Sequence, residues 1–82
     1  MYFIYVLRSK KKKYLYVGLT NNIARRFLQH QSGKEQTTAP YCPFELIHKE
    51  SFSTRAGARK REKELKSGYG KEWLKSRYPY SV

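Results

Sequence analysis

The chain has 82 residues with 18 Lys or Arg and 6 acidic residues, a formal net charge of +12. A chain of this length has room for one domain with a modest core, to which its many aromatic residues add buried area. We expect a single domain over residues 1–82, with its core at about residues 2–76. The single cysteine excludes an internal disulfide and a Cys-rich zinc site. All six acids are Glu, which disfavours a two-metal centre built from several carboxylates.

The charge and hydropathy also limit the location and the partners of the protein. No apolar run approaches the about 20 residues of a membrane-spanning helix, and the amino terminus lacks the pattern of a secretory signal peptide. We therefore expect a cytoplasmic protein that does not bind a membrane. A net charge of +12 is costly for a small domain unless a polyanion relieves the repulsion. Nucleic acid is the expected partner.

Two aromatic and β-branched segments near the amino terminus predict a pair of strands. Residues 2–7 and 14–19 have strand character. The basic turn between them is too short for a parallel crossover, so the pair is antiparallel. Because side chains alternate between the faces of a sheet, we expect Tyr5 and Tyr16 on the same side. Gly18 should leave that side open to a ligand.

The next segment has the signals of a short helix. It is predicted over residues 23–31, because asparagines precede it as caps and a Ser-Gly pair follows its end. Arg26 and His30 are four residues apart and so lie together on one flank of the apolar stripe, whereas Arg25 points to solvent. The stripe itself consists of Ile23, Ala24, Phe27 and Leu28.

The remainder of the chain predicts a loop, a third strand and two more helices. Residues 34–43 contain two prolines and are expected to lack regular structure. A strand is predicted at 44–52, a helix at 55–66 and, after a glycine-containing break, a short helix at 71–76. The tail, 77–82, is expected to be irregular. The fold class is therefore α+β, with the order β-β-α-β-α-α.

One acid stands out by its position on the second predicted helix. Glu62 shares a helical face with Ala58 and Leu65, which places it on the inward side. Carboxylate oxygens bind hard divalent ions, so Glu62 is a candidate ligand for one such ion. The alternative is a simple ion pair with Lys66 or with a neighbouring cation. His48, in the third strand, has no evident partner and is interpreted as structural.

Phenol, guanidinium, imidazole and carboxylate together suit phosphodiester hydrolysis. A Tyr hydroxyl can orient or deprotonate water if a cation lowers its pKa from about 10. The planar fork of Arg binds phosphate oxygens, and His can donate a proton or a hydrogen bond to phosphate. The structural alternatives are core tyrosines, an arginine that covers Phe27 and a histidine that closes a helix.

The chain resembles the GIY-YIG nuclease superfamily, and particularly its small single-domain bacterial members, from Tyr2 to about Leu74. The first motif is matched by Ile4-Tyr5, although Phe3 stands where the family name has Gly. The second motif is matched by Tyr16-Val17-Gly18, within a stretch from Tyr16 to His30 that is similar to the family throughout. The segment from Ala58 to Lys66 resembles the acidic helix of the family, with Glu62 at the metal-ligand position.

The resemblance implies a three-stranded antiparallel sheet flanked by helices, and one divalent ion, Mg²⁺ or Mn²⁺, on Glu62. It implies Tyr5 or Tyr16 as the water-activating phenol, and Tyr5 is the one we favour. It also implies Arg26 on the scissile phosphate, with His30 assisting. Many family nucleases carry an Asn in the final segment, and this chain has none there.

The predicted function is that of a metal-dependent endonuclease domain that acts on DNA in repair, recombination or nucleic-acid turnover. DNA is expected rather than RNA, recognised by its shape or with the help of a protein partner. The alternatives are a non-catalytic DNA- or RNA-binding module of the same fold and a small ribosome-associated protein. The residues expected to follow the nucleic-acid backbone are Lys10, Lys11, Lys12, Lys13, Arg25, Lys60, Arg61 and Lys63.

Overall fold

The computed structural model describes residues 1–80, and its elements follow the predicted order. The strands are β1 (Tyr2–Ser9), β2 (Leu15–Thr20) and β3 (Phe44–Phe52). The helices are α1 (Ile23–Gln31), the short 3₁₀ helix η1 (Ala39–Tyr41), α2 (Arg55–Lys66) and α3 (Gly68–Arg77).

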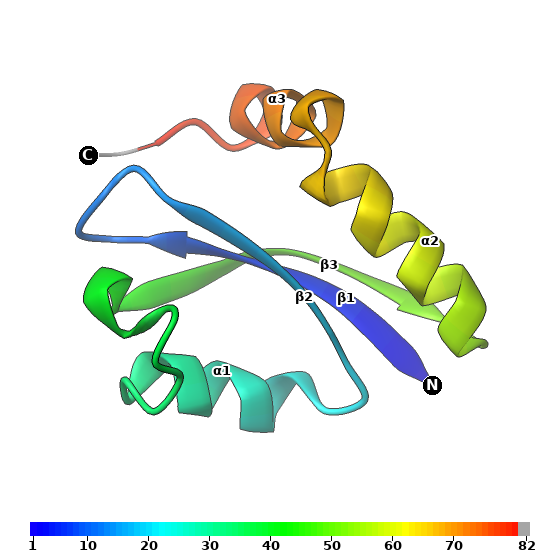
Figure 1. The fold of residues 1–82 in the computed structure, drawn as a ribbon, viewed down its shortest axis with the longest axis horizontal. Coiled ribbons are helices and arrows are strands. Elements are labelled where there is room, and N and C mark those ends of the chain that lie inside the picture. The colour runs from blue at the N-terminus through cyan, green and yellow to red at the C-terminus, as the bar shows by residue number, and fades with distance from the viewer. Residues whose placement is uncertain (81–82) are drawn as a thin grey trace.

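The strands form one antiparallel sheet in the spatial order β2-β1-β3, so β1 is central and β2 lies at an edge. Helix α1 covers one face of this sheet, and α2 and α3 lie over the other (Figure 1). This arrangement confirms the predicted α+β class and the order β-β-α-β-α-α. The two faces of the sheet therefore pack against helices from different parts of the chain.

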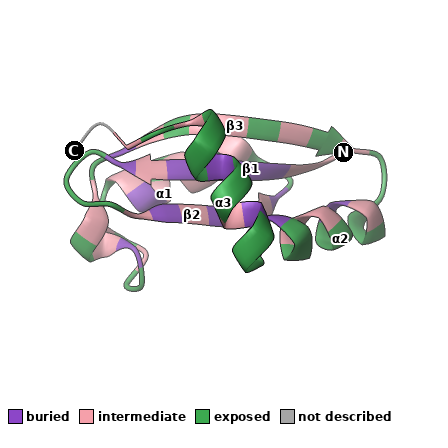
Figure 2. Cartoon of the chain, turned by 90° about the horizontal axis from the view of Figure 1, so that it is seen from above, coloured by how far each residue is buried: buried purple, intermediate pink, exposed green. Residues whose placement is uncertain are grey.

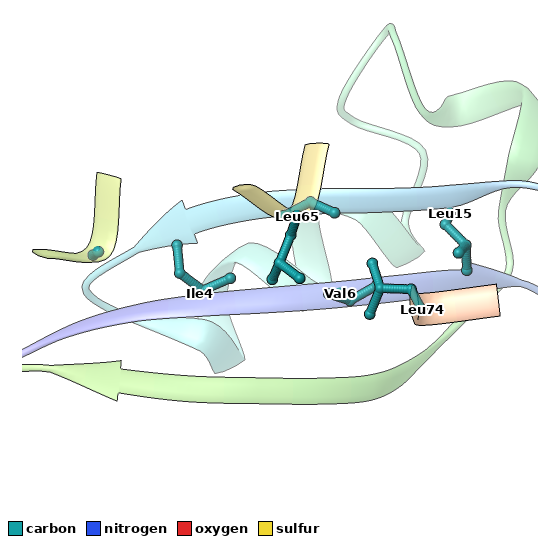
Figure 3. Close-up of a cluster of buried hydrophobic side chains, with 7 residues drawn as sticks. Ile4, Val6, Leu15, Leu65 and Leu74 are labelled. Carbon is teal, nitrogen blue, oxygen red and sulfur yellow. The ribbon is translucent and has the colours of Figure 1, made fainter. Parts of the chain in front are cut away.

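The face under α2 and α3 holds an aliphatic core. Ile4 and Val6 of β1 are fully buried and pack with Leu65 of α2 and Leu74 of α3, both shielded from solvent (Figure 3). Figure 2 shows that the buried residues concentrate along β1 and β2, while the outer side of α2 is exposed. Burying one such aliphatic side chain contributes about 1.5–3 kcal/mol, so this layer supplies much of the stability of the fold.

The face under α1 holds a second, more aromatic cluster. Tyr5, Leu7 and Phe44 are buried there. The half-buried side chains that pack against them are Tyr14, Tyr16, Ile23, Phe27, Tyr41 and Cys42. The alternation of side chains along β1 divides these residues from the aliphatic core, because successive residues of a strand face opposite sides of the sheet.

Helix α1 is rotated from the predicted orientation. The cap is as expected, since the side chain of Asn22 accepts a hydrogen bond from the backbone N–H of Arg25 at 3.1 Å. Ala24 and Leu28 were predicted to face the core, but both are exposed, Leu28 to 66%. The inward position is taken by His30, which is fully buried because partners on β1 and in the following loop bind its ring.

Two expectations for the loops are also corrected. The segment 34–43 contains η1, because Pro40 stands in its first turn, where a missing N–H needs no partner. Helix α3 begins at Gly68 rather than at residue 71, since the Oγ of Ser67 accepts a hydrogen bond from Gly70 N–H at 3.1 Å and caps the helix. The break between the last two helices therefore lies at Ser67.

None of the helices in the described part of the chain has the length and apolar character that crossing a bilayer requires. The predicted irregular tail extends to residues 81–82, which lie outside the described residues.

Candidate active site

The two motif tyrosines meet on the α1 face of the sheet. In the register of β1 and β2, Tyr5 lies opposite Gly18 and Leu7 lies opposite Tyr16. Directly paired residues of an antiparallel ladder point to the same face, so the two tyrosines are diagonal neighbours. Their ring centroids are 6.1 Å apart. The prediction that both tyrosines lie on one side of the sheet is confirmed.

Gly18 does not leave an open surface. A Cβ at this position would lie 2.5 Å from both Cζ and the hydroxyl oxygen of Tyr5. The ring of Tyr5 thus fills the space that the missing side chain leaves, and the expected direct approach of a ligand to this backbone is wrong. Gly18 thus lets the Tyr5 ring lie against the backbone of β2, from where its hydroxyl reaches His30 of α1.

The phenol of Tyr5 is the first member of a buried hydrogen-bond chain. The hydroxyl of Tyr5 lies 3.0 Å from Nε2 of His30, and Nδ1 of His30 lies 2.8 Å from Oγ1 of Thr38. Thr38 in turn donates to the carbonyl oxygen of Glu35 at 3.4 Å. Because the threonine hydroxyl donates there, it accepts from Nδ1–H, and Nε2 is left to accept from Tyr5. The tautomer of His30 is assigned from these hydrogen bonds.

The pKa shifts of His30 and Tyr5 agree with a hydrogen bond donated by the Tyr5 hydroxyl to Nε2 of His30. Burial lowers the pKa of His30, and the nearby charge of Arg26 lowers it further, so the imidazole is neutral at pH 7. Burial raises the pKa of Tyr5 to about 12, against the opposing influence of Arg26. The phenol therefore holds its proton in this arrangement and shares it with a neutral histidine that can receive it.

Arg26 and Tyr16 form the solvent side of the cluster. The side chain of Arg26 is 26% exposed, and its Nη1 donates to Oε1 of Gln29 at 2.6 Å and lies 3.5 Å from the Glu35 carboxylate. Burial lowers the pKa of Arg26, but the neighbouring Tyr5 and Glu35 more than offset this, so its net pKa is raised. Tyr16 is half-buried, with its ring centroid 4.7 Å from that of His30. These two side chains are the ones that a substrate can reach.

Sequence reasoning missed the loop residues that hold this cluster. Thr38 is 1% exposed and fixes the far nitrogen of His30, while Glu35 contributes a carbonyl to Thr38 and a carboxylate to Arg26. Both residues stand in an aperiodic loop, so no helical or strand pattern marks them as inward-facing. No sequence pattern marks them as partners of His30 and Arg26, because these contacts form only when the loop is folded.

Glu62 lies on the other side of the sheet. Its side chain is 12% exposed, in line with the predicted inward position, and it pairs with Lys66 at 3.2 Å and Arg59 at 3.9 Å. Arg61, on the opposite flank of α2, pairs with Glu50 of β3. The structure thus gathers Tyr5, Tyr16, Arg26 and His30 on the α1 face of the sheet, whereas Glu62 belongs to α2, which lies over the opposite face (Figure 1).

The donor groups around Glu62 allow only a limited kind of metal site. Among residues 1–80 no group of three His, Cys, Asp or Glu side chains gathers to hold an ion. Mg²⁺ is nevertheless commonly bound through one or two carboxylates together with water and substrate phosphates. A single carboxylate fits such a shared site, provided that Lys66 gives up its ion pair. It does not fit an ion enclosed by protein ligands alone.

The residues expected to contact nucleic acid differ in their exposure and in whether another side chain already binds them. Lys10, Lys11 and Lys13, together with Arg25, Lys60 and Lys63, are exposed. Lys12 is also exposed, and its Nζ lies 5.6 Å from the centre of the Tyr41 ring. Arg61 differs, because its Nε donates to both carboxylate oxygens of Glu50 at 3.0 and 3.1 Å. This ion pair links α2 to β3, so the guanidinium of Arg61 is less available to phosphate than the exposed lysines are.

Comparisons with known proteins place this geometry in a family. The family model described as the GIY-YIG catalytic domain matches residues 1–77. A UPF0213 protein of Natronomonas pharaonis is 39% identical over 67 residues, which cover 80% of this chain and 78% of that protein. A UPF0213 protein of Staphylococcus haemolyticus is 32% identical over 75 residues, or 90% of each chain.

A UPF0213 protein of Syntrophus aciditrophicus is 36% identical over 66 residues, covering 78% of this chain and 75% of that protein. The names of these relatives state no activity. No solved structure gives a significant match to the chain. The match of the family model extends from the first strand to the end of α3 and includes all the residues of the tyrosine, arginine and histidine cluster. The chain therefore belongs to the GIY-YIG catalytic domain family.

Proposed function

We propose that this chain is a metal-dependent endonuclease that hydrolyses phosphodiester bonds of DNA, in repair, recombination or nucleic-acid turnover. The observation that carries the proposal is the chain of hydrogen bonds from Tyr5 through His30 to Thr38, beside the guanidinium of Arg26. Any buried histidine must have hydrogen-bond partners on both ring nitrogens, so what supports a catalytic role is that this chain leads from the buried imidazole to a phenol beside the partly exposed Arg26. An imidazole so fixed is suited to accept a proton at a defined atom.

In the proposed reaction, the substrate phosphate binds the solvent side of the cluster. Arg26 binds its non-bridging oxygens, which become more negative as water attacks, and releases its bond to Gln29 to do so. The attacking water enters between Arg26 and Tyr16, because Tyr5 itself is only 1% exposed. Tyr16 orients that water through its hydroxyl.

The proton of the water is proposed to pass to Tyr5 while the proton of Tyr5 passes to Nε2 of His30. This coupled transfer avoids a free phenolate, which a pKa of about 12 makes costly at neutral pH. The imidazolium that results can later return the proton through Tyr5 toward the leaving oxygen. Thr38 keeps Nδ1 protonated throughout, so that Nε2 is the nitrogen that accepts.

Glu62 is the proposed ligand for one Mg²⁺ or Mn²⁺, which it would hold together with water and the substrate phosphate. When bound, such an ion supplies positive charge that stabilises the phosphoryl oxygens. Arg26 and Glu62 belong to helices on opposite faces of the sheet, and β2 is an edge strand. A DNA strand that lies across this edge would be the substrate that both residues contact. The exposed lysines of the first turn and of α2 would hold the flanking phosphates.

Cleavage of plasmid and branched duplex DNA in Mg²⁺ or Mn²⁺ tests the proposal. Arg26→Ala and Glu62→Ala should each lose about a hundredfold or more in rate, as removal of a group that stabilises transition-state charge does. Glu64→Ala is the matched control, because Glu64 is an exposed acid on the same helix, and it should cleave like the wild type. Equal rates in all four proteins would assign the activity to a contaminant and overturn the proposal.

The second candidate is a non-catalytic module that binds nucleic acid through charge. It is favoured by the ion pairs of Glu62, which leave that carboxylate neutralised by Lys66 and Arg59. This candidate predicts binding that weakens steeply with salt, no turnover, and unchanged or tighter binding in Glu62→Ala. Competition between DNA and RNA at fixed salt would then identify the preferred nucleic acid, including the case of a ribosomal RNA partner.

A further inference from the structure

An exposed aromatic pair lies on α3, on the face of the sheet opposite the tyrosine and histidine cluster. Tyr69 is 86% exposed and Trp73 is 37% exposed. They are four residues apart, so they occupy one side of the helix. Both line a cavity of about 370 Å³ at the junction of α2 and α3, together with Arg61, Glu64, Leu65, Ser67 and Gly70.

Neither ring is required to close the core. Leu74 is the residue of α3 that is fully buried in the aliphatic core, and Tyr69 contributes to neither hydrophobic cluster. Single exposed apolar residues are common, but two large aromatic rings beside one cavity are less expected on a small domain. Their exposure therefore calls for a function other than packing.

Trp73 is held in place by its neighbours. The ring of His48 contacts it edge-on, with centroids 5.6 Å apart and planes at 81°. The guanidinium groups of Arg61 and Arg77 each lie 5.6 Å from the centre of its ring. Arg61 is itself anchored by two hydrogen bonds to Glu50. The indole is thus a rigid platform with two cations next to it.

The close contact of the two helices sets the shape of the cavity. A Cβ at Gly70 would lie 2.1 Å from the carbonyl oxygen of Glu64 and 2.6 Å from Cα of Leu65, so only glycine permits this approach. The contact brings the start of α3 against the end of α2 and presents Tyr69 at the rim. The surroundings carry both signs of charge, because Glu64 lines the cavity and the exposed Lys66 and Lys75 pair with Glu62 and Glu72.

We propose that this surface, made of Tyr69, Trp73, Arg61 and Arg77, binds unpaired bases of a single-stranded nucleic acid. A base would stack on the aromatic side chains, and the exposed Arg77 would hold a phosphate that flanks it, while Arg61, which is bound to Glu50, keeps the indole in place. An apolar protein segment fits less well, because the net charge of +12 and the exposed Arg77 favour a polyanion. The proposal does not depend on catalysis, since the surface lies across the sheet from Arg26 (Figure 1).

The single tryptophan provides a direct test, because Trp73 is the only source of indole fluorescence. The probes are oligo(dT), oligo(U), a blunt duplex of equal charge and an oligomer of the same length without bases. Titrations are performed in EDTA, so that no metal-dependent cleavage takes place. Oligo(dT) or oligo(U) should quench the fluorescence strongly, while the duplex and the abasic oligomer should not. The relative affinity for the two oligomers tells whether DNA or RNA is preferred.

The variants separate stacking from charge. Tyr69→Ala should weaken binding of oligo(dT) about tenfold, the loss typical of one stacked base, with the salt dependence unchanged. Tyr69→Phe should restore it. Leu28→Ala is the matched control, since Leu28 is also an exposed apolar residue but lies on α1. Binding of Trp73→Leu, followed by the anisotropy of a labelled oligomer, should also weaken.

Two outcomes would overturn the proposal. One is equal affinity for the abasic oligomer and oligo(dT), which would show that charge alone governs binding. The other is wild-type affinity in Tyr69→Ala, a change that an 86% exposed residue allows without harm to the fold. Failure of the nuclease proposal would look different, because an inactive protein would still show base-dependent quenching in EDTA.

Discussion

The two faces of this sheet use the same strands for different purposes. On the α2 and α3 face, Ile4 and Val6 meet buried side chains that are all aliphatic, with tyrosines only among the partly buried residues around them. On the α1 face, Tyr5 meets His30 and, through it, Thr38. No buried side-chain N or O atom among the described residues lacks a hydrogen-bond partner. The comparison teaches that the stability of the fold and its candidate chemistry are carried by alternate residues of one strand.

The two histidines repeat this contrast. His30 is fully buried and linked to neutral hydroxyls, in a setting suited to moving a proton. His48 faces the other side, with Nε2 2.7 Å from the Glu50 carboxylate and Nδ1 2.9 Å from the Tyr78 hydroxyl. It was expected to have no evident partner, and it has two. Its position links β3 to the end of α3, which agrees with the structural role predicted for it.

The largest stability effect is expected from the aliphatic face. Leu65→Ala should lower the free energy of unfolding by about 2–5 kcal/mol, because the buried side chain leaves a cavity in a small core. Urea unfolding followed by far-UV circular dichroism measures the loss. Leu28→Ala, at an exposed position, is the control and should change stability little. A small loss in Leu65→Ala would mean that the α2 face contributes less than its burial indicates.

On the α1 face, Gly18→Ala tests whether stability and cleavage depend on the position of the Tyr5 ring. The added methyl group would overlap the Tyr5 ring, which must move and thereby stretch its bond to His30. We expect a loss of about 1–3 kcal/mol, the usual cost of overpacking. Thermal unfolding measures this loss of stability. The cleavage rate of the variant should fall by more than the decrease in its folded fraction accounts for. Gly68→Ala, where the added methyl group meets nothing, is the control.

Thr38 tests whether the hydrogen-bond chain depends on its last member. Thr38→Val keeps the shape but leaves Nδ1–H of His30 without an acceptor, which should cost about 1–3 kcal/mol. Thr38→Ser should restore both stability and the pH profile of cleavage. If valine shifts neither the pH profile nor the stability, Thr38 does not set the tautomer. If Thr38→Val loses stability but keeps the pH profile of cleavage, the role of Thr38 is structural only.

The smallest effect is a dependence of stability on pH. Because the folded-state pKa of His30 is lowered, the unfolded chain binds a proton more readily than the folded protein does just below pH 6.5. The contribution of His30 is therefore full above pH 6.5 and is lost as the pH falls through the folded pKa. Urea unfolding between pH 5 and 8 should show this slope in the wild type and a flatter one in His30→Gln. Identical slopes would contradict a lowered pKa.

Local sequence determined much of this molecule. The strand segments, the cap at Asn22, the helix at 55–66 and the common side of Tyr5 and Tyr16 all follow from patterns within a few neighbouring residues. Periods of 2 and 3.6 residues encode such features directly. The inward position of Glu62 followed from the same reasoning, because Ala58 and Leu65 mark the buried side of its helix.

The tertiary structure alone decided how these pieces face one another. The rotation that buries His30 and exposes Leu28 depends on partners from β1 and the loop after α1. The ring of Tyr5 over Gly18 depends on the strand register, and the separation of Glu62 from Arg26 depends on which face each helix covers. These are contacts between residues far apart in the chain, and a local period carries no information about them.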